Sequence, residues 1–354
     1  MHLRRLIVNF LVLVGVLFGA VVSAVGQDVT PPKPLPGQDI LVTPPREAPE
    51  KKHYRLPSDD IRAIDEEAGV LTPKGQFTIE PSLRYILSTS DRVVILGYTI
   101  LPAITVGLID VQSVDSTTVI GAFAVRYGLT NRIELEFKVP YVYRNDSNTG
   151  RELGTGTTRD TIFNADGYGL GDLEFSVRGQ LNQPGPQGPF YVGGVRVKAN
   201  NGKDLFEVPI DNNSGLPTEL PVGSGFWSVE PSITMIVPSD PVVFFGSAKY
   251  LWNIERTVNG NKVDPGDAIG GNIGLGFALN EKTSISFGFE MNVLGKNEEN
   301  GQRLGNSKTT YVGSLLFGTS YKLGENSGLN VSLNIGVTEA APDIDLTVRV
   351  PFSL

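Results

Sequence analysis

From Gln76 to the end of the sequence, apolar residues recur at every second position in a series of short segments. The clearest segment is 133–143, where one set of alternate positions is apolar and the other includes Glu134, Glu136 and Lys138. Because successive side chains of a β-strand point to opposite faces, this period of two predicts a strand with one apolar and one polar face. The same alternation runs through 77–87, 172–181, 227–237, 285–293 and 329–337, and less strictly through segments that begin near Thr117, Phe190, Val242, Ile269, Thr310 and Ile344. We count about twelve strands, with fourteen as the alternative.

The connectors between these segments alternate between long and short. Long connectors such as 144–169 and 200–225 are rich in Gly, Asn and Asp, whereas 128–131 and 280–283 are tight links. Single-chain bacterial outer-membrane barrels have long extracellular loops, short periplasmic turns and an even number of strands. The sequence therefore predicts an all-β fold, a transmembrane antiparallel up-and-down β-barrel in the outer membrane of a Gram-negative cell, with the N- and C-termini periplasmic.

The aromatic residues agree with this orientation. Tyr and Trp have an apolar body and a polar tip and collect at the lipid headgroups, whereas Phe lies within the hydrocarbon. The strand ends that we predict to be extracellular carry Tyr141, Tyr143, Trp227, Tyr250, Trp252 and Tyr311. The alternative is a large soluble barrel that has these aromatic residues in its core.

The barrel is predicted over residues 70–354. The residues before it divide into three segments. Residues 1–24 carry two Arg, an apolar run and a small-residue cleavage site, which predicts a removed signal peptide; a retained membrane anchor is the alternative. The proline-rich segment 25–57 predicts an extended periplasmic spacer. The segment 58–69 predicts a short acidic helix that either plugs the lumen or hangs free. We favour a free or loosely docked segment, because a helix of so few turns is not stable without packing.

The composition excludes most enzyme and metal chemistry. The sequence has no cysteine and only two histidines, His2 and His53, which both precede the barrel. A Ser–His dyad and a His- or Cys-ligated metal site are therefore not expected in the barrel, and we predict no enzyme, no catalytic residue, no metal and no cofactor. The net charge of −8 argues against a nucleic-acid partner.

The polar faces of the predicted strands carry acidic and basic residues in similar numbers. Adjacent pairs such as Glu134 and Glu136 are expected to form salt bridges and not an acid–base pair, with Arg126 nearly opposite Glu134. Near the outer rim, three successive strands are expected to bring together Glu174, Arg196, Lys198 and Glu230. The predicted lumen-lining residues are Glu80, Arg84, Arg126, Glu134, Glu136, Lys138, Glu174, Arg178, Arg196, Lys198, Glu230, Lys249, Glu290 and Arg349. Strong ion selectivity, which needs rings of one charge, is not expected.

The first long connector is too apolar for a solvated loop. Its apolar positions include Ile95, Leu101, Ile104 and Leu108. An exposed apolar segment of this length indicates a contact surface. We expect 93–111 to fold into the barrel mouth as an apolar entrance, to extend the wall as a further hairpin, or to touch lipid.

Several strings resemble the outer-membrane barrel family labelled for the meta-pathway of phenol degradation, whose members are often described as transporters. They include 69–73 (GVLTP), 80–83 (EPSL), 100–103 (ILPA), 126–132 (RYGLTNR), 139–144 (VPYVYR) and 169–172 (GLGD). The resemblance implies a passive channel for small hydrophobic or aromatic molecules and offers no catalytic residues. The alternative function is a non-transporting structural or surface-interaction barrel with a plugged lumen.

The predicted partners follow from the barrel itself. Its outer face is expected to meet outer-membrane lipid and lipopolysaccharide, and its lumen a small hydrophobic permeant. The alternating last strand, 344–354, resembles the signal by which the barrel-assembly machinery recognises its clients, although its final residue is Leu354 and not the commoner Phe.

Overall fold

The structure is a computed structural model that describes residues 71–89, 109–152, 160–183, 188–209, 218–239, 241–303 and 307–354. The predicted signal peptide (1–24), proline-rich spacer (25–57) and acidic helix (58–69) lie outside these residues, as do Ile95, Leu101, Ile104 and Leu108. Within the described ranges, no helix is long and apolar enough to cross a membrane.

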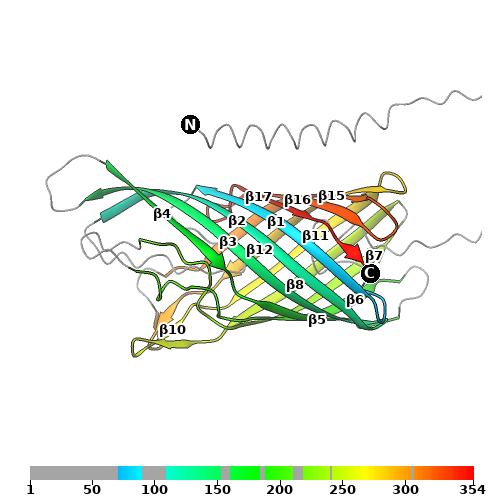
Figure 1. The fold of residues 1–354 in the computed structure, drawn as a ribbon, viewed down its shortest axis with the longest axis horizontal. Helices are drawn as coiled ribbons and strands as arrows, with labels where there is room; N and C mark the ends of the chain where they lie inside the picture. The colour runs from blue at the N-terminus through cyan, green and yellow to red at the C-terminus, as the bar shows by residue number, and fades with distance from the viewer. Residues whose placement is uncertain are drawn as a thin grey trace, which may run out of the picture. The chain divides into compact units, whose positions relative to one another are not determined.

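Twelve antiparallel strands form the wall of a closed barrel (Figure 1). Each strand pairs with its neighbour in the chain, and β1 closes the barrel by pairing with β17 from Ser82 opposite Arg349 to Leu87 opposite Ile344. The predicted fold class and strand number are confirmed. The wall strands are β1 (Phe77–Thr89), β2 (Ile109–Thr130), β3 (Ile133–Glu152), β5 (Glu174–Gln180), β6 (Phe190–Lys198), β7 (Ser228–Pro238), β8 (Val242–Asn253), β11 (Ala268–Ala278), β12 (Thr283–Leu294), β15 (Thr310–Lys322), β16 (Gly328–Gly336) and β17 (Ile344–Arg349).

The four tight links expected from the sequence lie together at one end of the barrel. The end with the β2–β3, β7–β8, β11–β12 and β15–β16 links is here called the short-turn end, and the opposite end the long-loop end. Chain direction places the start of β1 and the end of β17 both at the short-turn end. That this end faces the periplasm stays a prediction.

The long-loop end is more ordered than the sequence predicts. Most of the connector 144–169 is not a loop, because β3 continues to Glu152 and pairs with β4 (Asp160–Leu170). β2 also begins at Ile109, earlier than expected, and pairs with this extension of β3. The backbone ladder overrides the weak strand propensity of the Gly, Asn and Asp residues there.

Four short strands form a second sheet at the long-loop end: β9 (Arg256–Val258), β10 (Asn261–Asp264), β13 (Glu298–Glu299) and β14 (Gln302–Arg303). An Asn-Gly pair with positive φ joins each hairpin, Asn259-Gly260 in the first and Asn300-Gly301 in the second. Such pairs favour two-residue turns whose twist matches the flanking strands.

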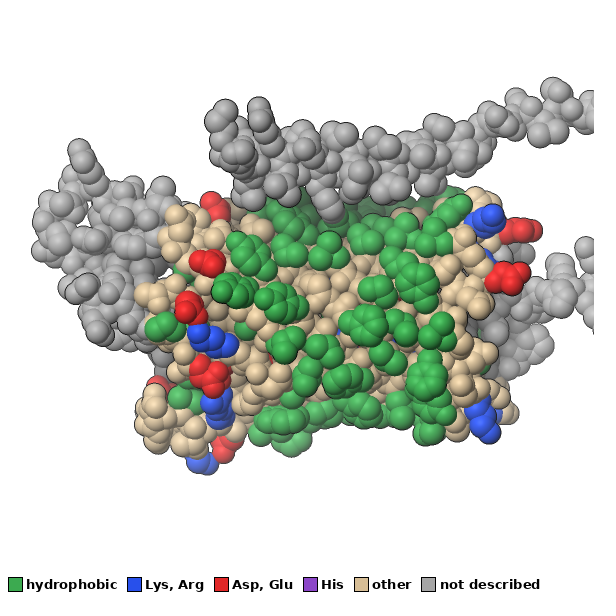
Figure 2. All heavy atoms as spheres, in the orientation of Figure 1, with side chains coloured by type: hydrophobic (Ala, Val, Ile, Leu, Met, Phe, Trp, Pro, Cys, Tyr) green, Lys and Arg blue, Asp and Glu red, His purple; other side chains and the backbone are tan. Residues whose placement is uncertain are grey.

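The two faces of the wall have opposite chemistry. Apolar side chains cover the middle of the outer surface and charged side chains gather at its two ends (Figure 2). Phe123 and Phe137 are nearly half exposed on the outside, whereas Glu80 and Arg126 are buried inside. Only lipid makes such an exposed apolar band favourable on a folded chain. The six predicted rim aromatics, Tyr141, Tyr143, Trp227, Tyr250, Trp252 and Tyr311, are all exposed.

The last predicted strand is interrupted. β17 ends at Arg349, and β18 (Phe352–Ser353) resumes the pairing with β1 at Thr78 and Ile79. Pro351 lies in the gap, where its missing N–H cannot contribute to the ladder. The alternation predicted over 344–354 is therefore carried by two strands.

Candidate functional site

The barrel encloses a cavity of about 240 Å³. Ten of the fourteen predicted lumen residues line it: Arg84, Glu136, Lys138, Glu174, Arg178, Arg196, Glu230, Lys249, Glu290 and Arg349. The other four, Glu80, Arg126, Glu134 and Lys198, are also inside the barrel, buried in ion pairs.

A charged network lies near the short-turn end. Arg126 donates to both oxygens of Glu80, at 2.8 and 3.0 Å, and also pairs with Glu136. Glu134 is fully buried and pairs with Arg178. Arg126 is therefore opposite Glu136 and not Glu134 as predicted. The β2–β3 ladder continues to Thr130 and Ile133, and this tighter turn shifts the register by two residues.

A second network crosses three strands nearer the long-loop end, where the sequence predicts one. Arg196 on β6 lies 3.1 Å from Glu174 on β5 and 2.8 Å from Glu230 on β7. A planar guanidinium holds two carboxylates in fixed positions better than a Lys ammonium. These contacts brace the wall strands and neutralise both acids.

The opposite wall is mostly uncharged. Its cavity-lining positions on β8, β11, β12, β16 and β17 include Ser247, Asn272, Asn292, Ser332, Asn334 and Thr347. The charged residues there are Lys249, Glu290, Asp345 and Arg349. Lys249 lies 2.9 Å from Glu290, and Asp345 lies 2.6 Å from Arg84 of β1. The lumen therefore has a charged wall and a neutral polar wall, without a ring of one sign in the described residues.

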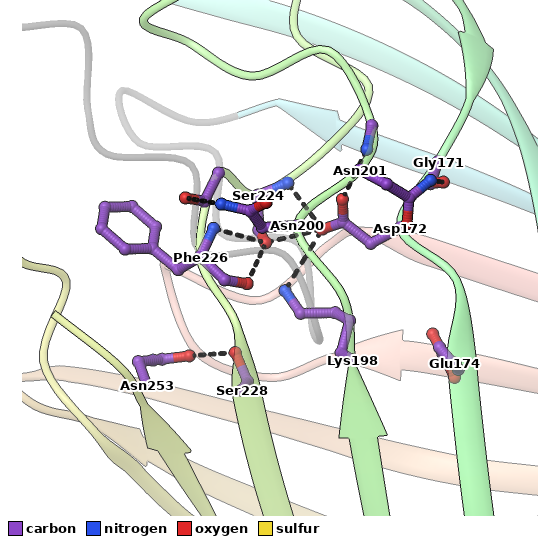
Figure 3. A network of polar contacts seen from close by, with 12 residues as sticks. Gly171, Asp172, Glu174, Lys198, Asn200, Asn201, Ser224, Phe226, Ser228 and Asn253 are labelled. Carbon is purple, nitrogen blue, oxygen red and sulfur yellow. Dashed lines mark hydrogen bonds and ion pairs between the residues drawn. The ribbon is translucent and has the colours of Figure 1, made fainter. Parts of the chain in front are cut away.

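Sequence reasoning missed the role of Asp172, which lies in the short link between β4 and β5. This side chain is fully buried, and Figure 3 shows it surrounded by polar groups of another connector. Its oxygens accept hydrogen bonds from Gly202 N at 3.0 Å, Ser224 N at 2.8 Å and Ser224 Oγ at 2.6 Å. Lys198 Nζ is 3.6 Å away and provides the opposite charge. A buried carboxylate needs such partners to stay ionised.

These bonds hold the inner loop, which we define as the described residues 199–209 and 218–227 between β6 and β7, against the barrel interior. Val222 of this loop packs on Ile86, Ile120 and Val142, which are inward-facing residues of β1, β2 and β3. The loop also approaches β4 closely, since a Cβ on Gly167 would lie 2.1 Å from the carbonyl oxygen of Leu220. The inner loop thus places an apolar contact inside the barrel at the long-loop end, and this contact is here called the apolar constriction.

Two further contacts anchor the inner loop from outside the lumen. Arg256 of β9 pairs with Asp204 and donates to the carbonyl oxygen of Gly225 at 3.0 Å. Phe226 packs with Val263 of β10 in a small apolar core. The second sheet therefore supports the loop that narrows the lumen.

The family model described as "Putative MetA-pathway of phenol degradation" matches residues 206–348. This confirms the family resemblance. The matched region runs from the inner loop to β17 and so covers the neutral wall and the second sheet.

Solved structures agree with the fold. The COG4313 outer membrane channel from Pseudomonas putida F1 matches with a TM-score of 0.54 and 16% identity, over 82% of this chain and 98% of that chain. At this identity the likeness shows the fold of an outer-membrane barrel. The Ralstonia pickettii toluene transporter TbuX has a TM-score of 0.41 and 8% identity, over 84% of this chain and 97% of that chain. This second match is too distant to support an inference.

Proposed function

We propose that this protein is a passive channel of the outer membrane for small neutral molecules with an apolar or aromatic part. The observation that carries the proposal is the lumen, which combines a cavity with balanced charge and an apolar constriction. The cavity is lined by six basic residues (Arg84, Lys138, Arg178, Arg196, Lys249, Arg349) and five acidic residues (Glu136, Glu174, Glu230, Glu290, Asp345). Such a lining gives little preference for either sign of ion.

The constriction favours a permeant with an apolar part. Val222 and the three wall residues that it contacts are each no more than 8% exposed, so a solute that enters between them meets hydrocarbon and loses water on that side. An apolar ring tolerates this loss better than a charged group does. The family resemblance is consistent with this class of solute.

The second candidate is a structural barrel with a closed lumen. The observation in its favour is that apolar contacts narrow both ends, since Ile236 and Phe245 also form a buried cluster near the short-turn end. Catalysis is not proposed, because the cavity-lining carboxylates named above are engaged in ion pairs.

The test is swelling of liposomes that contain the refolded protein. The solutes are a neutral aromatic glycoside, which crosses lipid slowly, an aromatic sulfonate of similar size and a disaccharide. We expect the glycoside to enter fastest, and Val222→Trp to slow its entry by filling the constriction. Swelling no faster than in protein-free liposomes for every solute would favour the structural barrel. Faster entry of the sulfonate would contradict the balanced lumen.

The partners outside the lumen are part of the same proposal. The apolar band and the rim aromatics fit outer-membrane lipid and lipopolysaccharide. We propose that the barrel-assembly machinery binds the alternating C-terminal segment, which consists of β17 and β18. Heat-modifiable electrophoresis of Phe352→Asp in cells measures this, with less folded barrel as the expected outcome.

A further inference from the structure

Three apolar side chains on the neutral polar wall face the lumen beside one another. Leu251 of β8, Ala268 of β11 and Leu294 of β12 line the cavity, and each of them is only partly buried. Ala268 lies directly opposite Leu251 in one ladder and opposite Leu294 in the next. Because adjacent strands are about 4.8 Å apart, the three side chains form a continuous apolar surface about 10 Å wide. These three residues are here called the shelf.

The shelf departs from the pattern of the wall. Lumen-facing positions of an outer-membrane barrel are normally polar, and Leu251 and Leu294 occupy such positions. Both side chains remain partly exposed to the cavity, so they do not belong to a closed apolar core. Apolar surface that is left in contact with water is unfavourable. An accessible apolar surface inside a polar lumen therefore indicates a place where the apolar part of a ligand binds.

A polar row adjoins the shelf on the side nearer the short-turn end. It consists of Lys249, Gly270 and Asn292, each two residues along its strand from a member of the shelf and paired in the same ladders. The Asn292 carboxamide lies over Gly270, since a Cβ there would overlap with its Oδ1. Lys249 Nζ is 2.9 Å from Glu290, so this ion pair adds no net charge. The polar groups beside the shelf are therefore neutral in sum.

Asn292 has hydrogen-bonding capacity for a ligand. The residue is 4% exposed, and its Nδ2 meets the geometry of a hydrogen bond with none of the described residues. Buried amides without a partner are rare in native structures, because they lose their hydrogen bonds to water without replacement. The last torsion of an Asn side chain is soft. A small rotation of this amide therefore directs its N–H toward an oxygen atom of a molecule on the shelf.

We propose that the shelf and Asn292 form the binding site for the permeant, a small neutral molecule that carries a hydroxyl or carbonyl oxygen beside an apolar ring or chain. The apolar part covers the shelf, and the oxygen accepts a hydrogen bond from Asn292 Nδ2. A charged group binds there poorly, because Lys249 and Glu290 already neutralise each other and a further ion would be left unpaired. The role of this site in passage rests on the proposed channel function, whereas binding itself does not.

Cysteine protection measures binding without a transport assay. The sequence has no cysteine, so Ala268→Cys places a single thiol at the centre of the shelf, and Lys282→Cys in an exposed short turn is the control. N-ethylmaleimide labels the full chain in lipid nanodiscs, where no detergent competes for the site. Phenyl glucoside at ten times its Kd should slow the labelling of Ala268→Cys about tenfold and leave Lys282→Cys unchanged. Naphthalenesulfonate, which is charged, and sucrose, which has no apolar part, should protect much less.

Substitutions in the Ala268→Cys chain test the two halves of the site. Asn292→Leu keeps the size of the side chain and removes the amide, so half-protection should need about tenfold more phenyl glucoside. Asn334→Leu makes the same change elsewhere in the cavity and should leave the protection unchanged. Leu251→Asn makes the shelf polar and should also weaken the protection, and it replaces Asn292→Leu if that variant does not fold in heat-modifiable electrophoresis.

Three results would overturn the proposal. The first is labelling of Ala268→Cys at the same rate with and without phenyl glucoside. The second is a thiol at this position that N-ethylmaleimide reaches only after denaturation, since the shelf would then be closed to solutes. The third is equal protection in the Asn292→Leu, Leu251→Asn and Asn334→Leu variants.

Liposome swelling with phenyl glucoside separates this site from the channel function. Swelling that is severalfold slower for Leu251→Asn than for Asn334→Leu would support both. Protection of Ala268→Cys without any swelling would reject the channel and keep the binding site. Swelling without protection would reject the binding site and keep the channel.

Discussion

Asp172 holds the inner loop in the lumen, and Asp172→Asn tests this directly. The carboxylate accepts three hydrogen bonds, from Gly202 N and from Ser224 N and Oγ, and faces Lys198. The amide keeps one acceptor oxygen but turns an NH₂ group toward N–H donors, and it leaves Lys198 without its nearest negative charge. Hydrogen bonds to a charged group contribute about 1.5–3 kcal/mol each, and breaking a buried ion pair costs about 3–5 kcal/mol.

The loss appears as release of the loop and not as unfolding of the barrel, because the wall strands keep their ladders. We take about 3 kcal/mol, the lower end of these costs, because the contacts of Arg256 and Phe226 remain. This raises the population of released loop by about two orders of magnitude. When opening is fast relative to cleavage, the rate of proteolysis follows this population.

The assay is trypsin cleavage after Lys203, which lies in the inner loop, followed by mass spectrometry of the protein in detergent. Asp172→Asn should be cleaved about a hundredfold faster than the unmodified chain, by the same population argument. Glu230→Gln is the matched control, since it neutralises a buried acid paired with Arg196 on the same wall. Equal cleavage rates for Asp172→Asn and the unmodified chain would refute the role of Asp172.

Three further substitutions follow from the geometry. Val222→Ser removes apolar burial worth about 1 kcal/mol and should speed entry of the disaccharide in liposome swelling, whereas Val222→Leu should not change it. Equal rates for the two variants would contradict an apolar constriction. Glu134→Gln leaves Arg178 and Arg126 with less negative charge beside them, so the free energy of unfolding measured in urea should fall by about 3 kcal/mol. Glu290→Gln should lower it less, because its partner Lys249 is partly exposed. Leu83→Lys places a charge on the lipid face and should cost about 2–4 kcal/mol of folding free energy in bilayers, whereas Ser82→Lys, one residue away in the lumen, should cost less. Equal costs would mean that the two faces are assigned wrongly.

The alternation of apolar and polar residues was enough to predict the wall. Strands β6, β8, β15 and β17 begin at Phe190, Val242, Thr310 and Ile344, the positions where the pattern begins. A period of two depends only on which face meets lipid, so it is readable from each segment alone. The Asn-Gly pairs at 259–260 and 300–301 were further local signals for the hairpins of the second sheet.

The contacts that shape the lumen are not local and were not predictable in this way. Asp172 and Ser224 are 52 residues apart, and no spacing rule joins an acid at a strand end to a serine in a distant connector. The pairing of Arg126 with Glu136 depends on the length of a turn, and a change of two residues there moves every partner. One signal was available, because Ile86, Ile120 and Val142 are apolar residues in otherwise polar registers.

The fold and the proposed function both require that the apolar face of this wall meets lipid. The sequence has two tryptophans, Trp227 and Trp252, and both are exposed on the outer face near the long-loop end. Tryptophan fluorescence of the protein in bilayers with brominated lipids measures their depth directly. Lipids brominated near the headgroup should quench this fluorescence strongly, and lipids brominated at the chain end only weakly. Fluorescence unaffected by every brominated lipid would contradict contact between this face and lipid.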